Sequence, residues 1–173
     1  MRSFNSIGKQ VLLAGLSAIA LAACSDNDND TTPPPPPPPP AMASFDVTVT
    51  NLTNRQPLSP VAVIAHQDGY SAFTIGSAAT AGLETLAEGG DNSMLLMEAG
   101  ADMNVLASGS GAAPIGPAGS ETVTIEVLES DVPNLRFSVS TMLVNTNDAV
   151  SGVSGVDVSG LAEGDAWSGR GIV

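Results

Sequence analysis

The chain has 173 residues, of which five are basic and eighteen are acidic, so its formal net charge at pH 7 is −13. Nucleic-acid binding needs a basic surface that neutralises phosphates, and this charge balance excludes it, so we expect no nucleic-acid partner. Aromatic residues make up 3% of the chain, whereas small and β-branched residues and glycine are frequent. This composition favours a β-rich domain with many turns.

The first two dozen residues have the organisation of a secretory signal. Arg2 and Lys9 give a positively charged start, and an apolar run follows over residues 11–20. Such a run is too short to cross a bilayer comfortably and is typical of a removable leader. The closing segment, Leu21-Ala22-Ala23-Cys24, resembles the lipobox of bacterial lipoproteins. That resemblance implies cleavage before Cys24, attachment of diacylglycerol to its thiol and acylation of its new amino group.

Cys24 is the chain's one cysteine, so it has no disulfide partner within the chain. The alternative is an ordinary cleaved signal that leaves a free thiol. Two or three acyl chains would anchor the protein almost permanently, without a transmembrane helix. We therefore expect residues 1–23 to be a signal peptide and the mature protein to be membrane-bound in the bacterial cell envelope through lipidated Cys24. Ser25 stands where some such lipoproteins carry an inner-membrane aspartate, which favours the outer membrane.

Residues 24–43 are expected to form a linker. Asp26, Asp28 and Asp30 imitate the start of a calcium-binding hand, but Thr31 and Pro37 replace its essential glycine and glutamate. The uninterrupted proline run over residues 33–40 predicts a polyproline II spacer of about 25 Å. The alternative is a docking site for a proline-binding module.

Residues 44–173 are expected to form one domain. Alternation predicts a strand over 45–50, a turn follows over 51–57, and a nearly continuous apolar run over 60–66 predicts a strand buried on both faces or passing from core to rim. Helical spacing predicts a helix over 78–88 that ends at Gly89-Gly90. A second helix is expected to start after Asp91, Asn92 or Ser93 and to run to Gly100.

The second half of this domain reads as strands and loops. The Gly-, Ala-, Ser- and Pro-rich segment 107–120 predicts a surface loop. Strands are expected over 121–127, 135–144 and 149–158, and 163–171 is loop-like. Five or more strands with two short helices in one crossover predict an all-β fold, an antiparallel β-sandwich.

The order of these segments resembles the bacterial members of the spondin N-terminal domain family. The matching segments are Val47–Thr53, Gln56–Pro60, Ala65-His66 with Asp68-Gly69, Phe73 with Ile75-Gly76, Leu83–Asp91 and Ser140–Ala149. The resemblance implies a C2-like β-sandwich and a role in extracellular adhesion. It also implies a calcium (Ca2+) site in loops at one end of the sandwich, with Asp148 as one metal ligand.

The chain departs from the family where the other two acidic calcium ligands are expected. Asp165-Ala166 is followed by Trp167, and no acidic residue comes after it. Either the chain is a truncated member that lost the calcium site, or Asp157 and Asp165 substitute. Calcium requires six or more oxygen ligands, so we expect the site to be lost or weakened.

The inventory of reactive side chains argues against an enzyme. His66 is the one histidine, Cys24 is assigned to lipid, and no lysine follows Lys9. A triad of His66, Asp68 and a serine, a pair of carboxylates for glycoside chemistry, and a zinc site each lack a recognisable motif. We expect no enzyme but a lipid-anchored, non-catalytic binding or adhesion module, calcium-modulated or not, with an unknown envelope or extracellular ligand. The alternative is a structural envelope lipoprotein without a metal site.

Overall fold

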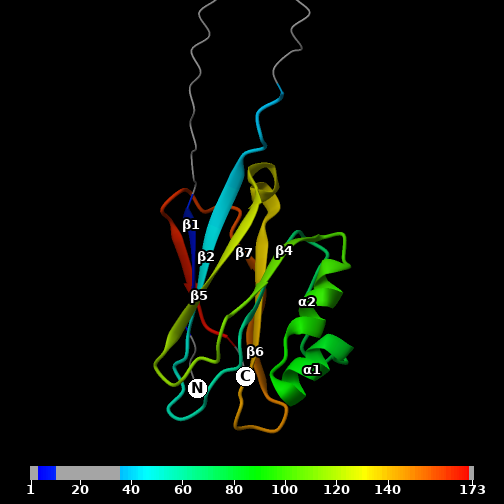
Figure 1. The fold of residues 1–173 in the computed structure, drawn as a ribbon, viewed down its shortest axis with the longest axis vertical. Coiled ribbons are helices and arrows are strands. Elements are labelled where there is room, and N and C mark those ends of the chain that lie inside the picture. Colours follow the sequence, from blue (N-terminus) through cyan, green and yellow to red (C-terminus); the bar gives the residue numbers. More distant parts are fainter. Residues whose placement is uncertain (1–3, 11–35, 172–173) are drawn as a thin grey trace, which may run out of the picture.

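The computed structural model describes residues 4–10 and 36–171. Its strands form two four-stranded sheets, of order β5-β2-β1-β8 and β4-β3-β6-β7, in which neighbouring strands are antiparallel. The sheets pack face to face, and two helices cover the outer side of one of them (Figure 1). The predicted all-β sandwich is confirmed. The elements are β1 (Phe4–Gln10), β2 (Met42–Thr50), β3 (Ala62–His66), α1 (Ala81–Gly89), α2 (Ser93–Gly100), β4 (Val105–Ser110), β5 (Ser120–Leu128), the 3-10 helix η1 (Glu129–Asn134), β6 (Arg136–Met142), β7 (Val150–Asp157) and β8 (Ala166–Gly169).

Strands β2 and β5 alternate as predicted, with one face in the core and one in solvent. Phe45 of β2 is fully buried, and its ring lies 5.5 Å from that of Phe137 in the opposite sheet. The outer face of the same sheet is polar, and the hydroxyls of Thr48 and Thr122 hydrogen-bond across the strands at 2.8 Å. This division fixes which face of the sheet meets the core, since a one-residue slip would exchange the faces.

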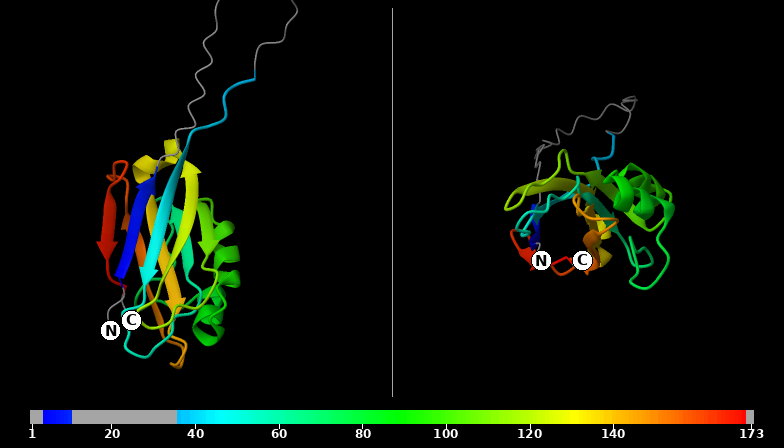
Figure 2. Two further views of the ribbon diagram at one scale, coloured as in Figure 1. Left: turned by 60° about the vertical axis from the view of Figure 1, so that its left-hand side comes forward. Right: turned by 90° about the horizontal axis from the view of Figure 1, so that it is seen from below.

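Strand β3 is buried along its whole length, as its continuous apolar run predicted. Val63 and Ala65 face the core between the sheets, whereas Ala62 and Ile64 pack against the helices. The helices therefore form a third layer on the β3 sheet (Figure 2). A strand with apolar cover on both sides needs no polar face, which explains the missing alternation.

Both predicted helices are confirmed, and both lie in the connection between β3 and β4. The Thr80 side chain caps α1 by accepting a hydrogen bond from the backbone N–H of Leu83 at 3.2 Å. Gly90 ends α1 in the left-handed conformation, with φ of 71°, and its N–H bonds the Leu86 carbonyl. Glycine adopts this conformation without the steric cost that a Cβ would add.

Two segments predicted as loops contain strands. Residues 105–110 form β4 rather than the start of a loop over 107–120, and residues 166–169 form β8. Their composition is poor in strand-forming residues, but β4 pairs with β3 over five residues and β8 pairs with β1. Backbone pairing with a neighbour, which the local sequence does not display, decides both cases.

Strand β1 lies within the segment predicted as a signal peptide. Residues 4–10 pair with β2 on one side and with β8 on the other, and the Ile7 side chain is fully buried in the core. This strand was not expected from the sequence. The remainder of the predicted leader and Cys24 lie outside the described residues, as does most of the linker.

The sandwich has two distinct ends. Strand β2 enters at Met42, directly after the exposed residues 36–41, and finishes at Thr50. The β2–β3 loop (51–61) and the β6–β7 loop (143–149) lie at the opposite end from the linker (Figure 1). Functional side chains on these two loops therefore face away from the point at which the linker joins.

Candidate functional site

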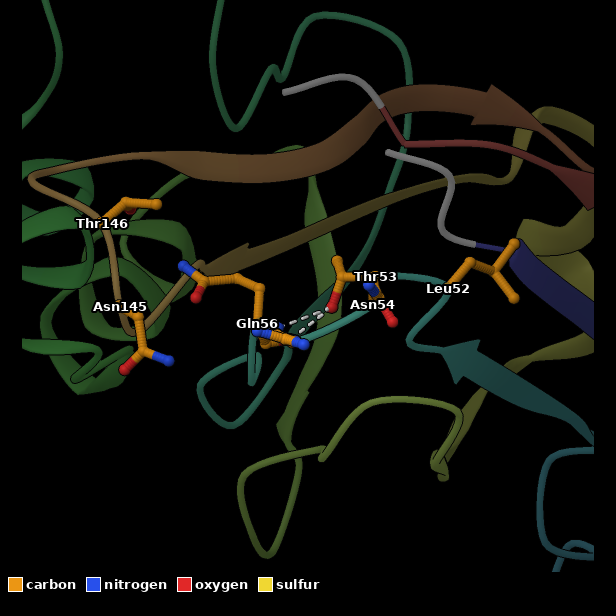
Figure 3. A pocket seen from close by; sticks show the side chains of 7 residues that line it. Leu52, Thr53, Asn54, Gln56, Asn145 and Thr146 are labelled. Carbon is orange, nitrogen blue, oxygen red and sulfur yellow. Dashed lines mark hydrogen bonds between the residues drawn. The ribbon is translucent and has the colours of Figure 1, made fainter.

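The β2–β3 and β6–β7 loops border an open cavity of about 740 Å³ at this end of the sandwich. We call it the loop pocket. Its lining combines three side-chain amides, two hydroxyls, one guanidinium and one leucine, and Figure 3 shows how these side chains lie around it. The lining residues are Leu52, Thr53, Asn54, Arg55, Gln56, Asn145 and Thr146.

The β2–β3 loop holds its shape through hydrogen bonds of its own. Asn51 is fully buried, and its side-chain NH2 donates to the carbonyls of Gln56 and Ile115, each at 2.8 Å. Its side-chain oxygen accepts from the backbone N–H of Thr53 at 2.9 Å. The Thr53 hydroxyl donates to the Gln56 carbonyl and accepts from the Gln56 N–H. The pocket wall is thus fixed before any ligand arrives, which lowers the ordering cost of binding.

The Gln56 side chain is the unusual feature of the pocket. The residue is 6% exposed, and its Nε2 atom is buried without a hydrogen-bond partner. A buried donor left unpaired costs about 1–3 kcal/mol. Figure 3 shows the Gln56 amide directed toward the loop that carries Asn145 and Thr146. Gln56 is thus one of the residues that line the pocket, and its unpaired donor lies beneath the pocket surface.

The pocket chemistry is that of a donor-rich binding site. Arg55 and Asn54 are exposed at its edge, and no carboxylate lies among its seven lining residues. Guanidinium and amide groups donate hydrogen bonds to hydroxyl, carbonyl or carboxylate oxygens. Leu52, which is 39% exposed, adds an apolar surface. The pocket suits an oxygen-rich ligand with one apolar face.

Asp148 lies on the β6–β7 loop, at the same end as the pocket, and it is exposed in a left-handed conformation with φ of 62°. The two proposed substitutes lie elsewhere. Asp157 ends β7, about 23 Å of extended strand from Val150, and the Asp165 carbonyl lies at Lys9 near the entry of β2. The structure therefore does not bring Asp157 and Asp165 to Asp148, as the alternative of substitution would require.

Asp148 is not joined by two further acidic side chains in the described part of the chain. Calcium takes six to eight oxygens, several of them from carboxylates. Within residues 4–10 and 36–171, no three His, Cys, Asp or Glu side chains come together in a group that could hold a metal ion.

Both ring nitrogens of His66 have hydrogen-bond partners. It is fully buried, its Nδ1 lies 2.8 Å from the Gln67 carbonyl, and its Nε2 lies 2.9 Å from the Ser138 hydroxyl. A carbonyl only accepts, so Nδ1 carries the proton and Ser138 donates to Nε2. Burial is the main cause that lowers the pKa of His66 below 6.5. Asp68 instead pairs with Arg136 at 3.1 Å, so the triad considered from the sequence is not assembled.

Two carboxylates line a second cavity, of about 420 Å³, beside Tyr70. Glu98 accepts a hydrogen bond from the backbone N–H of Gly82 at 2.9 Å, which fastens α1 to α2. Asp102 accepts from the N–H and side-chain amide of Asn104 and shapes the turn after α2. Burial, helped by Asp102 and Glu98, raises the pKa of Tyr70 to about 12. Both acidic side chains are thus engaged in holding the helical layer.

Comparison with models of known protein families and with curated proteins finds no match. The resemblance to the spondin N-terminal domain family stays a prediction. Among the described residues, no helix is long and apolar enough to cross a membrane.

The sequence did not single out the loop pocket as a site. Residues 51–57 were predicted as a turn, but the turn pattern carries no sign that Gln56 is buried with an unpaired amide. The one signal that could have indicated the loop pocket is Arg55, a basic residue in a polar loop of a chain with few basic residues.

Proposed function

We propose that this chain is a lipid-anchored, non-catalytic binding module of the bacterial cell envelope, with the loop pocket as its ligand site. The lipid anchor rests on the Leu21–Cys24 segment and the outer-membrane location on Ser25. The adhesion role rests on the resemblance to the spondin family. A β-sandwich that carries a site on the loops at one end suits such a role, since loops vary while the sheets hold them in place.

One observation carries the binding site. Gln56, whose Nε2 is buried without a hydrogen-bond partner, is one of the residues that line a cavity of about 740 Å³. The free-energy cost of an unpaired buried donor in the free protein is offset when a ligand oxygen accepts its hydrogen bond. With Arg55 and the amides beside it, the ligand we propose is a polyhydroxylated or carboxylated glycan.

The test replaces Gln56 by methionine, which keeps the length of the side chain and removes the donor. We expect the free energy of unfolding of Gln56→Met to stay the same or to rise by up to about 1 kcal/mol, because an unpaired buried donor is lost. A panel of neutral and uronic-acid oligosaccharides is first screened against wild type. Gln56→Met should then bind the oligosaccharides that wild type binds at least tenfold more weakly. Urea unfolding and titration calorimetry measure the two effects.

Gln67→Met is the matched control. The Gln67 amide donates to the Asp131 carbonyl at 2.9 Å, far from the loop pocket, so its loss should lower the free energy of unfolding by about 1 kcal/mol and leave glycan binding unchanged. If Gln56→Met destabilises the protein as Gln67→Met does, the Gln56 amide has a structural partner and the proposed site is wrong. Equal glycan binding by both variants would lead to the same conclusion.

A further inference from the structure

Strand β1 is a central strand of its sheet. It pairs with β2 over seven residues, from Phe4 opposite Thr50 to Gln10 opposite Ser44, and with β8 over four. Ile7 is opposite Val47 on one side and Trp167 on the other, and its side chain is fully buried. On the outer face, the Gln10 amide donates to the Asp46 carboxylate at 3.2 Å.

The proposed function removes this strand from the mature protein. Cleavage before Cys24 detaches residues 1–23, and the charged start of a signal stays on the cytoplasmic side while the domain folds outside. In one molecule, residues 4–10 therefore cannot serve both as the start of a leader and as β1 of an exported sandwich. The inference below rests on the proposed function for this reason.

Removal of β1 opens a slot between β2 and β8. Strand β2 would then present unpaired backbone groups along most of its length, and β8, which has β1 as its sheet neighbour, would lose that pairing. The floor of the slot is the apolar site that Ile7 fills. An exposed strand edge beside an apolar groove is a template for pairing with another chain.

We propose that, in the mature lipoprotein, this slot binds an extended strand of another polypeptide, antiparallel to both β2 and β8. Strand β1, which occupies the slot in the structure, indicates the side chains that such a strand should carry. An aliphatic side chain fills the Ile7 position, and a hydrogen-bond donor or a basic group faces Asp46. The acidic balance of the mature chain, with three basic and eighteen acidic residues, also favours an uncharged or basic strand.

The test uses the full-length gene, expressed in a bacterial host and purified as the processed lipoprotein in detergent. The probe is a synthetic peptide with the sequence of residues 4–10, and the control peptide carries Ile7→Asp. We expect the first peptide to raise the melting temperature of the lipoprotein and to slow hydrogen exchange of the β2 amides that face β1 rather than β5. The Ile7→Asp peptide should bind at least tenfold more weakly, because it places a carboxylate in the apolar floor.

A covalent version gives a second readout. Strand β8 ends at Gly169, opposite Asn5, so a copy of residues 4–10 joined after Val173 by a short turn can enter the slot in the direction of β1. This self-complemented chain should melt higher than the lipoprotein and no longer respond to the peptide. The same extension with Ile7→Asp in the copy should behave as the unextended chain does.

The outcomes separate the two proposals. Mass spectrometry that finds residues 1–23 still attached, or membrane binding that survives Cys24→Ser, overturns the proposed lipoprotein function. A cleaved lipoprotein that neither binds the peptide nor gains from the extension overturns the strand-acceptor proposal alone. Slow exchange, without peptide, of those β2 amides that face β1 rather than β5 also overturns it, because that edge of β2 is then already paired.

Discussion

At the residue scale, the hydrogen bonds of His66 in the sheet that carries the helices depend on its ring being neutral. Its neutral ring accepts from Ser138 and donates to the Gln67 carbonyl, and the Tyr70 ring packs edge-on at 5.0 Å. Protonation would turn Nε2 into a donor that faces a hydroxyl already fixed by the Gly155 N–H. The buried charge would also lack water.

This arrangement predicts a loss of stability on mild acidification. The pKa of His66 is lowered in the folded protein, mainly by burial, so the unfolded chain binds the proton more readily. The His66 contribution to the free energy of unfolding is therefore complete above the unfolded pKa of about 6.5 and declines as pH falls toward the folded pKa. Urea unfolding at pH 7.5 and 5.5 should show a stability difference between wild type and His66→Gln that shrinks at the lower pH. Parallel pH profiles would contradict this prediction.

At the element scale, two glycines of α1 test how closely the helices pack. A Cβ on Gly82 would lie 2.6 Å from the Leu95 Cα, whereas a Cβ on Gly89 would meet nothing within 4 Å. Gly82→Ala should therefore destabilise the protein by about 1–3 kcal/mol through overpacking. Gly89→Ala should stabilise it by up to about 1 kcal/mol, because alanine has the higher helix propensity. Thermal unfolding of both variants measures the contrast, and an equal effect would show that α1 does not touch α2 at Gly82.

The elements also show what the sequence could and could not predict. Strands β2 and β5 were found because a polar and an apolar face alternate, and α1 because apolar residues recur at helical spacing before Gly89-Gly90. Strand β4 was missed because Gly109 stands at a position where a strand would otherwise carry an apolar side chain. The space above this glycine is filled by Val123 and Ile125 of β5. At the loop pocket, the turn over residues 51–57 was predictable, but the unpaired amide of Gln56 depends on long-range packing that no local pattern contains.

At the scale of the whole molecule, charge repulsion opposes folding. Acidic residues outnumber basic ones by eighteen to five, and Arg136 is shared between Asp68 at 3.1 Å and Asp157 at 3.9 Å. Salt shortens the range of repulsion from about 30 Å at 0.01 M to about 10 Å at 0.1 M. The melting temperature should therefore rise by a few degrees over this range, and a fall would show that ion pairs outweigh repulsion.

Calcium provides a sharper version of this measurement. Because the residues around Asp148 do not assemble a ligand set, calcium chloride should raise the melting temperature no more than magnesium chloride of equal ionic strength. Asp148→Asn should respond to both salts as wild type does. A further rise with calcium that Asp148→Asn abolishes would establish a calcium site at the β6–β7 loop.

The placement of the two ends of the sandwich sets how far the proposed site stands from the bilayer. Nine residues of β2 separate the linker from the loop pocket, a length of about 30 Å at the rise of an extended strand. The eight prolines add about 25 Å if they form the predicted rod. On a lipidated chain, the pocket would then be held beyond the head groups and the shorter saccharides attached to them. At that distance, we expect the pocket to reach ligands on neighbouring surfaces more readily than ligands on its own membrane.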